Sequence, residues 1–265
     1  MTQVQRPRSP APARARMFIQ DLDLTCEADG DGEGEGAVGD ASVGPLVRGP
    51  AGGVRPSLLA TVADVIGGTP ACRATAPRLA LTLDIAVRVV AQPPGERVRV
   101  AARVLKVGRN TVATAVDMTD PATGALVALC HLTFVPSPRP QDLAPPSLGG
   151  MRTDGTISVP LPELVGARVT SPGVVEVDHR PYVVQGSGAL QGGIVALLAE
   201  LAAESLGGGP VVDLDTRYLS TVRVGPGRAV AEHAGGGLFR VEVRDAGAGA
   251  GDRLAAVATA RVAPA

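Results

Sequence analysis

Two segments of the sequence repeat one another, and each has the character of a helix. Residues 54–64 read VRPSLLATVAD, and residues 190–200 read LQGGIVALLAE. When the two segments are aligned, apolar positions meet apolar positions and Asp64 meets Glu200. A match of this kind indicates one structural unit that occurs twice in the chain.

The segments around the two helices also match, because β-rich runs bounded by turn residues flank both of them. The runs after the first helix are 79–91, 96–107, 111–120 and 125–135, and those after the second are 211–224, 227–234, 238–245 and 254–262. One strand candidate precedes each helix, at 17–27 and 173–180. A parallel sheet needs a helix at every crossover, so one helix for five strands excludes it. The pattern predicts an α+β fold with two antiparallel sheets, each wrapped around one central helix. The repeat further predicts that the two sheets pair edge to edge, with both helices on the inner side.

Composition marks the predicted domain boundaries. Residues 1–16 are rich in Arg, Pro and Ala, which predicts a flexible tail, and 137–156 form a linker that begins with a Pro- and Gly-rich run. This leaves one domain at 17–136 and a second, with the better-preserved motif, at 157–265. The acidic run GDGEGEG at 30–36 is a loop insertion that lacks the ligand pattern of a calcium site.

Composition also disfavours several functional classes. The net charge is −1, from 25 basic and 26 acidic side chains, so no nucleic-acid partner is expected. No apolar run approaches ~18 residues, so no membrane span is expected. The cysteines, Cys26, Cys72 and Cys130, are far apart and form no CxxC, which disfavours disulfides and a zinc site. We expect buried thiols, no metal and a reducing, cytoplasmic location.

The two helices carry the candidate functional groups. Each has a bulky face and a face of small residues, and Asp64 and Glu200 occupy the same place on the small faces. A carboxylate among small and apolar side chains has a shifted pKa and is a candidate base or nucleophile. The second helix begins with Gln191-Gly192-Gly193, whose backbone N–H groups can hold a developing oxyanion.

These residues resemble the signature of the hotdog-fold acyl-CoA thioesterases of the PaaI-like and 4-hydroxybenzoyl-CoA thioesterase type. The residues that match in order and spacing are Gln185, Gly188, Gln191-Gly192-Gly193 and Glu200. The first copy has diverged, with Gly49 in the Asn/Gln position, Arg55 in the His position and Pro56-Ser57 in place of Gly-Gly. The resemblance implies a tandem hotdog that hydrolyses an acyl-CoA or acyl-carrier thioester without a metal or cofactor. It assigns Gly192 as the oxyanion donor and Gln185 as the residue that positions substrate or water. The expected substrate-binding residues are Gly193, Gln191 and Arg55.

Spacing along the second helix predicts that each active site is composite. Gly192 and Glu200 are eight residues apart, or about 12 Å along a helix, whereas a catalytic group must lie ~3 Å from the reacting atoms. In the family that this chain resembles, sites form between two hotdogs, so the carboxylate would come from the other half on an antiparallel helix. Site one then combines Gln185 and Gly192 with Asp64. Site two combines Gly49 and Pro56 with Glu200.

Pro56 makes the two sites unequal. Proline has no N–H to donate, and Gly49 has no amide side chain, so site two lacks both groups. Site one is therefore the predicted active site, with Asp64 as the catalytic carboxylate and Glu200 as the second candidate. Whether that carboxylate attacks the thioester or activates water stays open.

Two other functions compete with thioester hydrolysis. A noncatalytic acyl-CoA-binding or regulatory hotdog protein fits the decay of the first-half motif. A hotdog dehydratase or hydratase needs a catalytic His before or on the helix, and His179 lies too far upstream. The expected partner is acyl-CoA, and the expected form is a pseudo-dimer within one chain, with further pairing into a homodimer left open. No motif encodes the acyl length or the choice between CoA and a carrier protein.

Overall fold

The computed structural model describes residues 16–29, 36–139, 141–144, 150–153, 155–249 and 251–264. The predicted tail up to residue 15 and the acidic loop at 30–35 lie outside this range. The elements of the first half are η1 (Phe18–Gln20), β1 (Leu24–Asp29), β2 (Gly36–Ser42), η2 (Pro45–Val47), α1 (Pro56–Thr75), β3 (Ala80–Val89), β4 (Arg97–Val107), β5 (Val112–Thr119) and β6 (Leu126–Pro136).

A short strand and a second set of elements complete the chain. They are β7 (Met151–Arg152), α2 (Leu161–Val165), β8 (Arg168–Ser171), β9 (Val174–Val177), η3 (Pro181–Val183), α3 (Gly192–Gly207), β10 (Val211–Tyr218), β11 (Gly227–Gly235), β12 (Leu238–Asp245) and β13 (Arg253–Val262). The predicted order of a strand region, one long helix and four strands is present in both halves. No helix among the described residues is long and apolar enough to cross a membrane.

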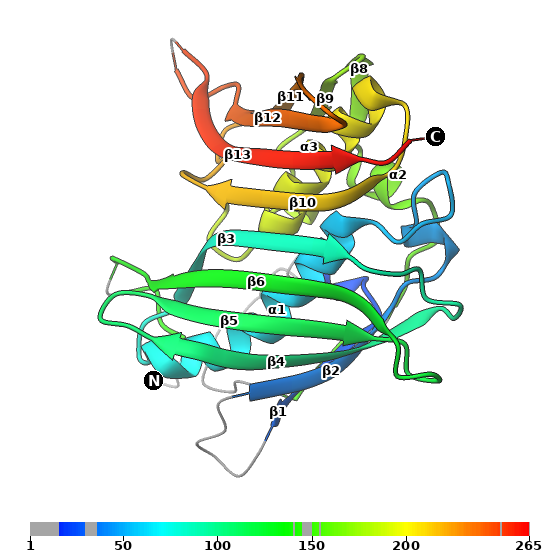
Figure 1. Cartoon of the computed structure of the whole chain (residues 1–265). Coiled ribbons are helices and arrows are strands. Elements are labelled where there is room, and N and C mark those ends of the chain that lie inside the picture. Colours follow the sequence, from blue (N-terminus) through cyan, green and yellow to red (C-terminus); the bar gives the residue numbers. More distant parts are fainter. Residues whose placement is uncertain are drawn as a thin grey trace, which may run out of the picture.

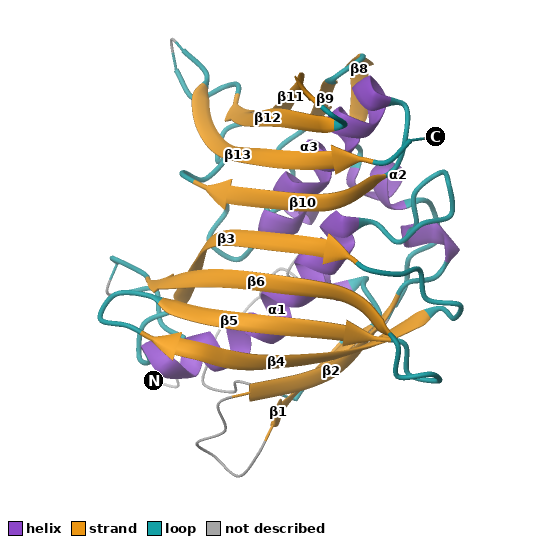
Figure 2. Ribbon diagram, in the orientation of Figure 1, coloured by secondary structure: helices purple, strands orange, loops and turns teal. Residues whose placement is uncertain are grey.

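The strands of the described residues form one continuous antiparallel sheet, in which the sheets of the two halves are joined edge to edge as expected from the repeat. The order is β7-β1-β2-β4-β5-β6-β3-β10-β13-β12-β11-β9-β8. The halves join where β3 pairs with β10, with Ile85 opposite Thr216 near the middle of the ladder. An edge strand presents unpaired N–H and C=O groups, and here each half satisfies the edge of the other. Both long helices lie on the same face of this sheet (Figure 1, Figure 2).

The start of the chain departs from the prediction. Residues 17–27 were expected to be one strand, but 18–20 form the 3-10 helix η1 and the strand begins only at Leu24. Strands β2 and β8 were not predicted, because β2 (GAVGDAS) has small residues without a bulky alternating pattern and β8 is exposed and short. The predicted linker contributes β7, which pairs with β1.

The core is aliphatic, as the composition indicated, and the two helices are its centre. Leu58, Ile66, Ile194 and Leu198 are fully buried in one continuous hydrophobic cluster. Each helix packs on the strands of its own half and also against the other helix, so residues on several faces of each helix are buried. All three cysteines are free and buried, as predicted.

The loops that lead into the two helices have the same backbone, which confirms the alignment of the repeat. The matching isolated bridges are Arg48–Val54 in the first half and Val184–Leu190 in the second. Gly52 and Gly188, which the alignment pairs, both have φ of +77°. This left-handed conformation favours glycine. The two loops therefore deliver the two helix starts in the same geometry.

Candidate active site

The first turn of each long helix packs against a later turn of the other helix. In one direction, the backbone N–H of Ser57 in α1 donates to Oε2 of Glu200 in α3 at 2.7 Å. In the other direction, Gly193 in α3 lies so close to Thr61 that an added Cβ would be 1.8 Å from Thr61 Oγ1. The helices thus have the antiparallel arrangement that composite sites require.

Site two is closed by ion pairs. Arg55 Nη1 donates to Glu200 Oε1 at 2.7 Å and to Glu204 Oε2 at 2.9 Å. The Arg55 side chain is 3% exposed and that of Glu200 is 0% exposed. Burial raises the pKa of Glu200 to about 7, while Arg55 and the Ser57 N–H act in the opposite direction. Both oxygens of the Glu200 carboxylate are therefore occupied by groups of α1.

A cavity of about 230 Å³ adjoins this ion-paired cluster. Its lining includes Gly49, Arg55, Pro56, Gln92, Glu200 and Glu204. Gly49 borders the ion-paired cluster, since a Cβ added there would lie in ordinary contact at 3.7 Å from Glu204 Oε1 and 3.9 Å from Arg55 Cζ. Arg55 was predicted to bind substrate, but its guanidinium is engaged by two carboxylates of its own chain.

Site one contains the other helix carboxylate in a different setting. Thr82 Oγ1, on β3, donates to Asp64 Oδ1 at 2.5 Å. Burial raises the pKa of Asp64 to about 6, and the Thr82 hydrogen bond limits the rise. Among the described residues, no cation pairs with Asp64. A carboxylate with this pKa is ionised at neutral pH and can still accept a proton.

Tyr218 links this carboxylate to the start of α3. Its hydroxyl donates to the backbone carbonyl of Gly192 at 3.0 Å. Burial raises the pKa of Tyr218, and the negative charge of Asp64 raises it further, which places the phenol within electrostatic range of the carboxylate. Asp64 and the first peptide of α3 therefore lie near the same phenol.

The α3 start retains free donors. Gln191 is the N-cap, and its Oε1 accepts from the N–H of Ile194 at 3.1 Å, so this side chain has a capping role. Within the described part of the chain, the N–H groups of Gly192 and Gly193 donate to no acceptor. Unpaired N–H groups at a helix start form an anion-binding position.

Gln185 lies in the loop just before α3, with an exposed side chain. Its backbone closes the turn, since the Gly188 N–H donates to Gln185 O at 2.8 Å. His179 Nε2 lies 2.9 Å from the Gly188 carbonyl, and Arg223 Nη1 donates to Ser187 O at 2.7 Å. The turn is thus held from two sides.

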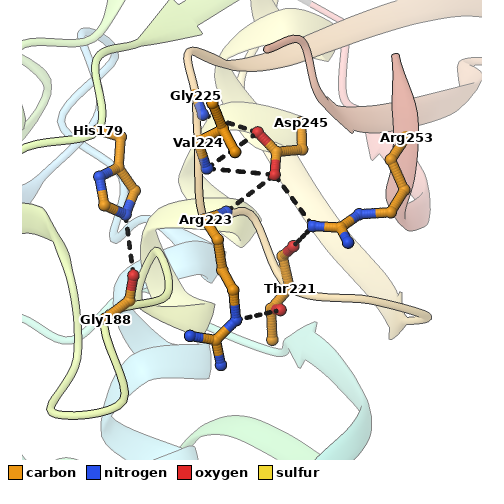
Figure 3. A network of polar contacts seen from close by, with 8 residues as sticks. All are labelled: His179, Gly188, Thr221, Arg223, Val224, Gly225, Asp245 and Arg253. Atoms are coloured by element: carbon orange, nitrogen blue, oxygen red, sulfur yellow. Dashed lines mark hydrogen bonds and ion pairs between the residues drawn. The ribbon is translucent and has the colours of Figure 1, made fainter. Parts of the chain in front are cut away.

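The loop that carries Arg223 is itself fixed by a buried carboxylate. Asp245 accepts from the backbone N–H groups of Arg223, Val224 and Gly225 and from the side chain of Arg253 (Figure 3). Burial opposes ionisation of Asp245, but these donors outweigh it and lower the pKa of the carboxyl. This network is structural, and it holds the loop from which Arg223 contacts the turn before α3.

The structure identifies site residues that the sequence analysis missed. Thr82 and Tyr218 contact site one, and Ser57 and Glu204 contact site two. Tyr218 carried a usable signal, because it is one of only two tyrosines and lies in the strand after the motif helix. Thr82 carried none, since a threonine in a β-rich run is ordinary. No group of three His, Cys, Asp or Glu residues among the described positions could hold a metal ion.

The fold is similar to that of several solved structures. The acyl-ACP thioesterase from Bacteroides thetaiotaomicron has 11% identity and a TM-score of 0.59, over 86% of this chain and 98% of that chain. The 12:0-ACP thioesterase from Umbellularia californica has 14% identity and a TM-score of 0.59, over 88% and 98%. A protein from Alicyclobacillus acidocaldarius described as having a hot dog fold has 16% identity and a TM-score of 0.50, over 94% and 98%.

These likenesses show that the chain has the hotdog fold. They extend over nearly the whole length of the similar chains, so both halves take part in the match. No protein-family model matches the sequence, and no curated protein matches it. At these identities, the chemistry of the chain has to be argued from its own residues.

Proposed function

We propose that this protein hydrolyses an acyl thioester to a free acid and a thiol, and that site one is the active site. The observation that carries the proposal is that site one has both free N–H donors, at Gly192 and Gly193, and a partly buried carboxylate without a cation partner, at Asp64. Acyl transfer to water requires N–H donors that stabilise the developing oxyanion and a carboxylate whose pKa lies near the working pH.

In the proposed reaction, the thioester oxygen accepts hydrogen bonds from the Gly192 and Gly193 N–H groups. Asp64 either removes a proton from water, whose oxygen then bonds to the carbonyl carbon, or attacks that carbon itself and forms an anhydride that water then hydrolyses to the free acid and Asp64. The carbon–sulfur bond breaks, and the thiolate leaves with its electron pair. Gln185, in the exposed loop before α3, positions substrate or water. Both halves contribute groups, so one chain acts as a pseudo-dimer.

The similar structures support the choice of a thioester. Two of them are named acyl-ACP thioesterases, and they match this chain over most of its length. We propose acyl-CoA as the substrate, with an acyl-carrier protein as the alternative thiol. Both present the acyl group on the same type of sulfur, so the chemistry at Asp64 is the same for either.

A noncatalytic function in acyl-CoA binding is the second candidate, and site two favours it. There both oxygens of the Glu200 carboxylate accept from Arg55 and the Ser57 N–H, so the helix-start donor of that site is already occupied. A chain in which both sites only bind would retain affinity for acyl-CoA without releasing thiol.

The test is thiol release from a panel of acyl-CoAs and acyl-carrier proteins of graded chain length, with Asp64→Asn as the control. We expect turnover of at least one substrate by the wild-type chain and its loss in the variant. Binding without thiol release by the wild type would favour the noncatalytic candidate. In a single turnover in ¹⁸O water, label that enters Asp64 identifies direct attack, because water adds to the Asp64 carboxyl carbon only after that carboxyl has formed an anhydride.

A further inference from the structure

Tyr218 is a half-buried phenol that, among the described residues, hydrogen-bonds to the backbone of site one and to no side chain. It lies at the end of β10, its hydroxyl donates to the Gly192 carbonyl at 3.0 Å, and its ring covers Gly192. A Cβ added to Gly192 would lie 3.5 Å from the phenol oxygen and ring. The side chain therefore contacts the first helical peptide with both its ring and its hydroxyl.

We propose that Tyr218 is a positioning residue that orients and polarises the peptide between Gly192 and Gly193, so that its N–H becomes a stronger oxyanion donor. This inference rests on the proposed function. The carbonyl that Tyr218 binds and the Gly193 N–H belong to the same peptide unit. Donation to that carbonyl draws electron density from the nitrogen, so the N–H donates more strongly, as in any chain of hydrogen bonds.

The equivalent donor in site two shows that this N–H is well placed to hold an oxygen anion. Ser57 stands where Gly193 stands in the repeat, and its N–H binds the Glu200 carboxylate at 2.7 Å. The two strands that join the halves differ at this place. Ile85 in β3 pairs with Thr216 in β10, and two residues further along each strand the side chains are Val87 in β3 and Tyr218 in β10. Val87 has no hydroxyl, so of these two side chains only Tyr218 can donate to the carbonyl of the peptide that carries the donor N–H.

The phenol stays a donor throughout the working range of the enzyme. Burial and the charge of Asp64 both raise its pKa, so Tyr218 remains protonated at neutral pH. It donates no proton in the reaction, because its hydrogen bond is made to a backbone carbonyl. The hydroxyl therefore acts through the Gly192–Gly193 peptide.

The test removes the hydroxyl alone, as Tyr218→Phe, and uses the only other tyrosine as the matched control. Tyr182 donates to Asp21 of the first half and, among the described residues, has no hydrogen bond to a group of site one, so Tyr182→Phe removes an equal group from outside that site. We expect Tyr218→Phe to lower kcat about tenfold with KM little changed. The acid limb of its pH profile should match that of the wild type. Tyr182→Phe should keep the wild-type kcat.

Several outcomes overturn the inference while leaving the proposed function intact. These are an unchanged kcat in Tyr218→Phe, a loss confined to KM, or a shifted acid limb, which would mean that Tyr218 acts on Asp64. If Tyr218→Phe does not fold, 3-fluorotyrosine incorporated into the Tyr182→Phe chain keeps the ring and makes the hydroxyl a stronger donor. A higher kcat then supports the inference, and an equal or lower one refutes it. A wild-type chain that releases no thiol refutes the proposed function instead.

Discussion

Site one and site two are built on the same frame, with an antiparallel helix, a helix start and a carboxylate at matching positions, yet their contents differ. In site two the longer Glu200 side chain reaches the helix start and binds the Ser57 N–H, and Arg55 holds its other oxygen. In site one the shorter Asp64 side chain bonds to Thr82 in the sheet, and the α3 donors stay free.

The comparison teaches that one methylene group and one cation accompany the difference between occupied and free donors at a helix start. A glutamate opposite a helix start acts as an internal ligand that satisfies the helix dipole and caps an orphan N–H. The aspartate in the same place bonds to the sheet instead, and the N–H groups at the start of α3 keep no acceptor among the described residues. A duplicated fold can thus turn one site into a structural link between its halves while the other keeps its donors.

The largest effect is expected at Asp64. Asp64→Asn keeps the shape of the side chain and removes its charge, so we expect kcat on a thioester to fall about 10²–10⁴-fold. The measurement is kcat/KM by thiol release on one good substrate, with circular dichroism to check the fold. Glu200→Gln is the paired change and should lower stability more than kcat. A dead Glu200→Gln with an active Asp64→Asn would reverse the assignment of the two sites.

The next effect comes from placing the proline of site two into site one. Gly192→Pro removes one N–H, and we expect kcat to fall about 10²–10³-fold, as for loss of an oxyanion donor. The chain should fold, because Gln191 has φ −66° and ψ 139°, which suits a residue before proline, and proline is favoured at the first helical position.

The reciprocal change, Pro56→Gly, is the matched control. It restores an N–H to site two, but Glu200 and Arg55 still fill that site. We therefore expect no gain in turnover. A folded Gly192→Pro chain with full activity would contradict the role assigned to the start of α3.

The ion-paired cluster of site two is expected to affect stability. Arg55→Met leaves the buried Glu200 without its cation, and loss of one partner of a buried pair costs about 3–5 kcal/mol of unfolding free energy. Urea unfolding measures this. Arg168→Met breaks a pair in which both side chains are more than half exposed, and it should cost about 1 kcal/mol or less. Equal losses from the two variants would mean that site two does not link the halves.

The repeat could be predicted from the sequence because it follows from local patterns, whereas the antiparallel pairing of the two helices was expected from the resemblance to the hotdog family. Helical spacing set which helix residues share a face, and the absence of an N–H on Pro56 is a property of the residue itself. The equal φ of Gly52 and Gly188 shows that the alignment was correct to the residue.

The side chains that surround the two carboxylates could not be predicted from the sequence, because they are brought there by contacts between distant segments. Arg55 was assigned to substrate, although the same pairing that joined Pro56 to Glu200 also brought Arg55 beside that carboxylate. Thr82 and Tyr218 reach site one only because β3 and β10 pair at the centre of the sheet. The edge-to-edge joining of the two sheets was expected from the repeat, but nothing in either edge strand identifies β3 and β10 as the pair that joins them.

The smallest effect is a shift in pH dependence, and it tests which carboxylate works. Asp64 must be ionised to accept a proton or attack, and burial raises its pKa to about 6. Activity should therefore fall about tenfold per pH unit as the pH drops below about 6. The titratable groups that sense its charge are Tyr218 and Cys72, and burial raises the pKa of both, so neither ionises in this range.

Thr82→Val sharpens this test, because it removes the hydrogen bond that stabilises the ionised form of Asp64 without changing the side-chain shape. The pKa of Asp64 should rise, and the acid limb of kcat/KM should move to higher pH. Glu200→Gln should leave the limb in place, since that carboxylate lies in the other site. If the limb instead disappears in Glu200→Gln and stays fixed in Thr82→Val, the ionisation that governs turnover belongs to site two, and the link between the halves is also the catalytic group.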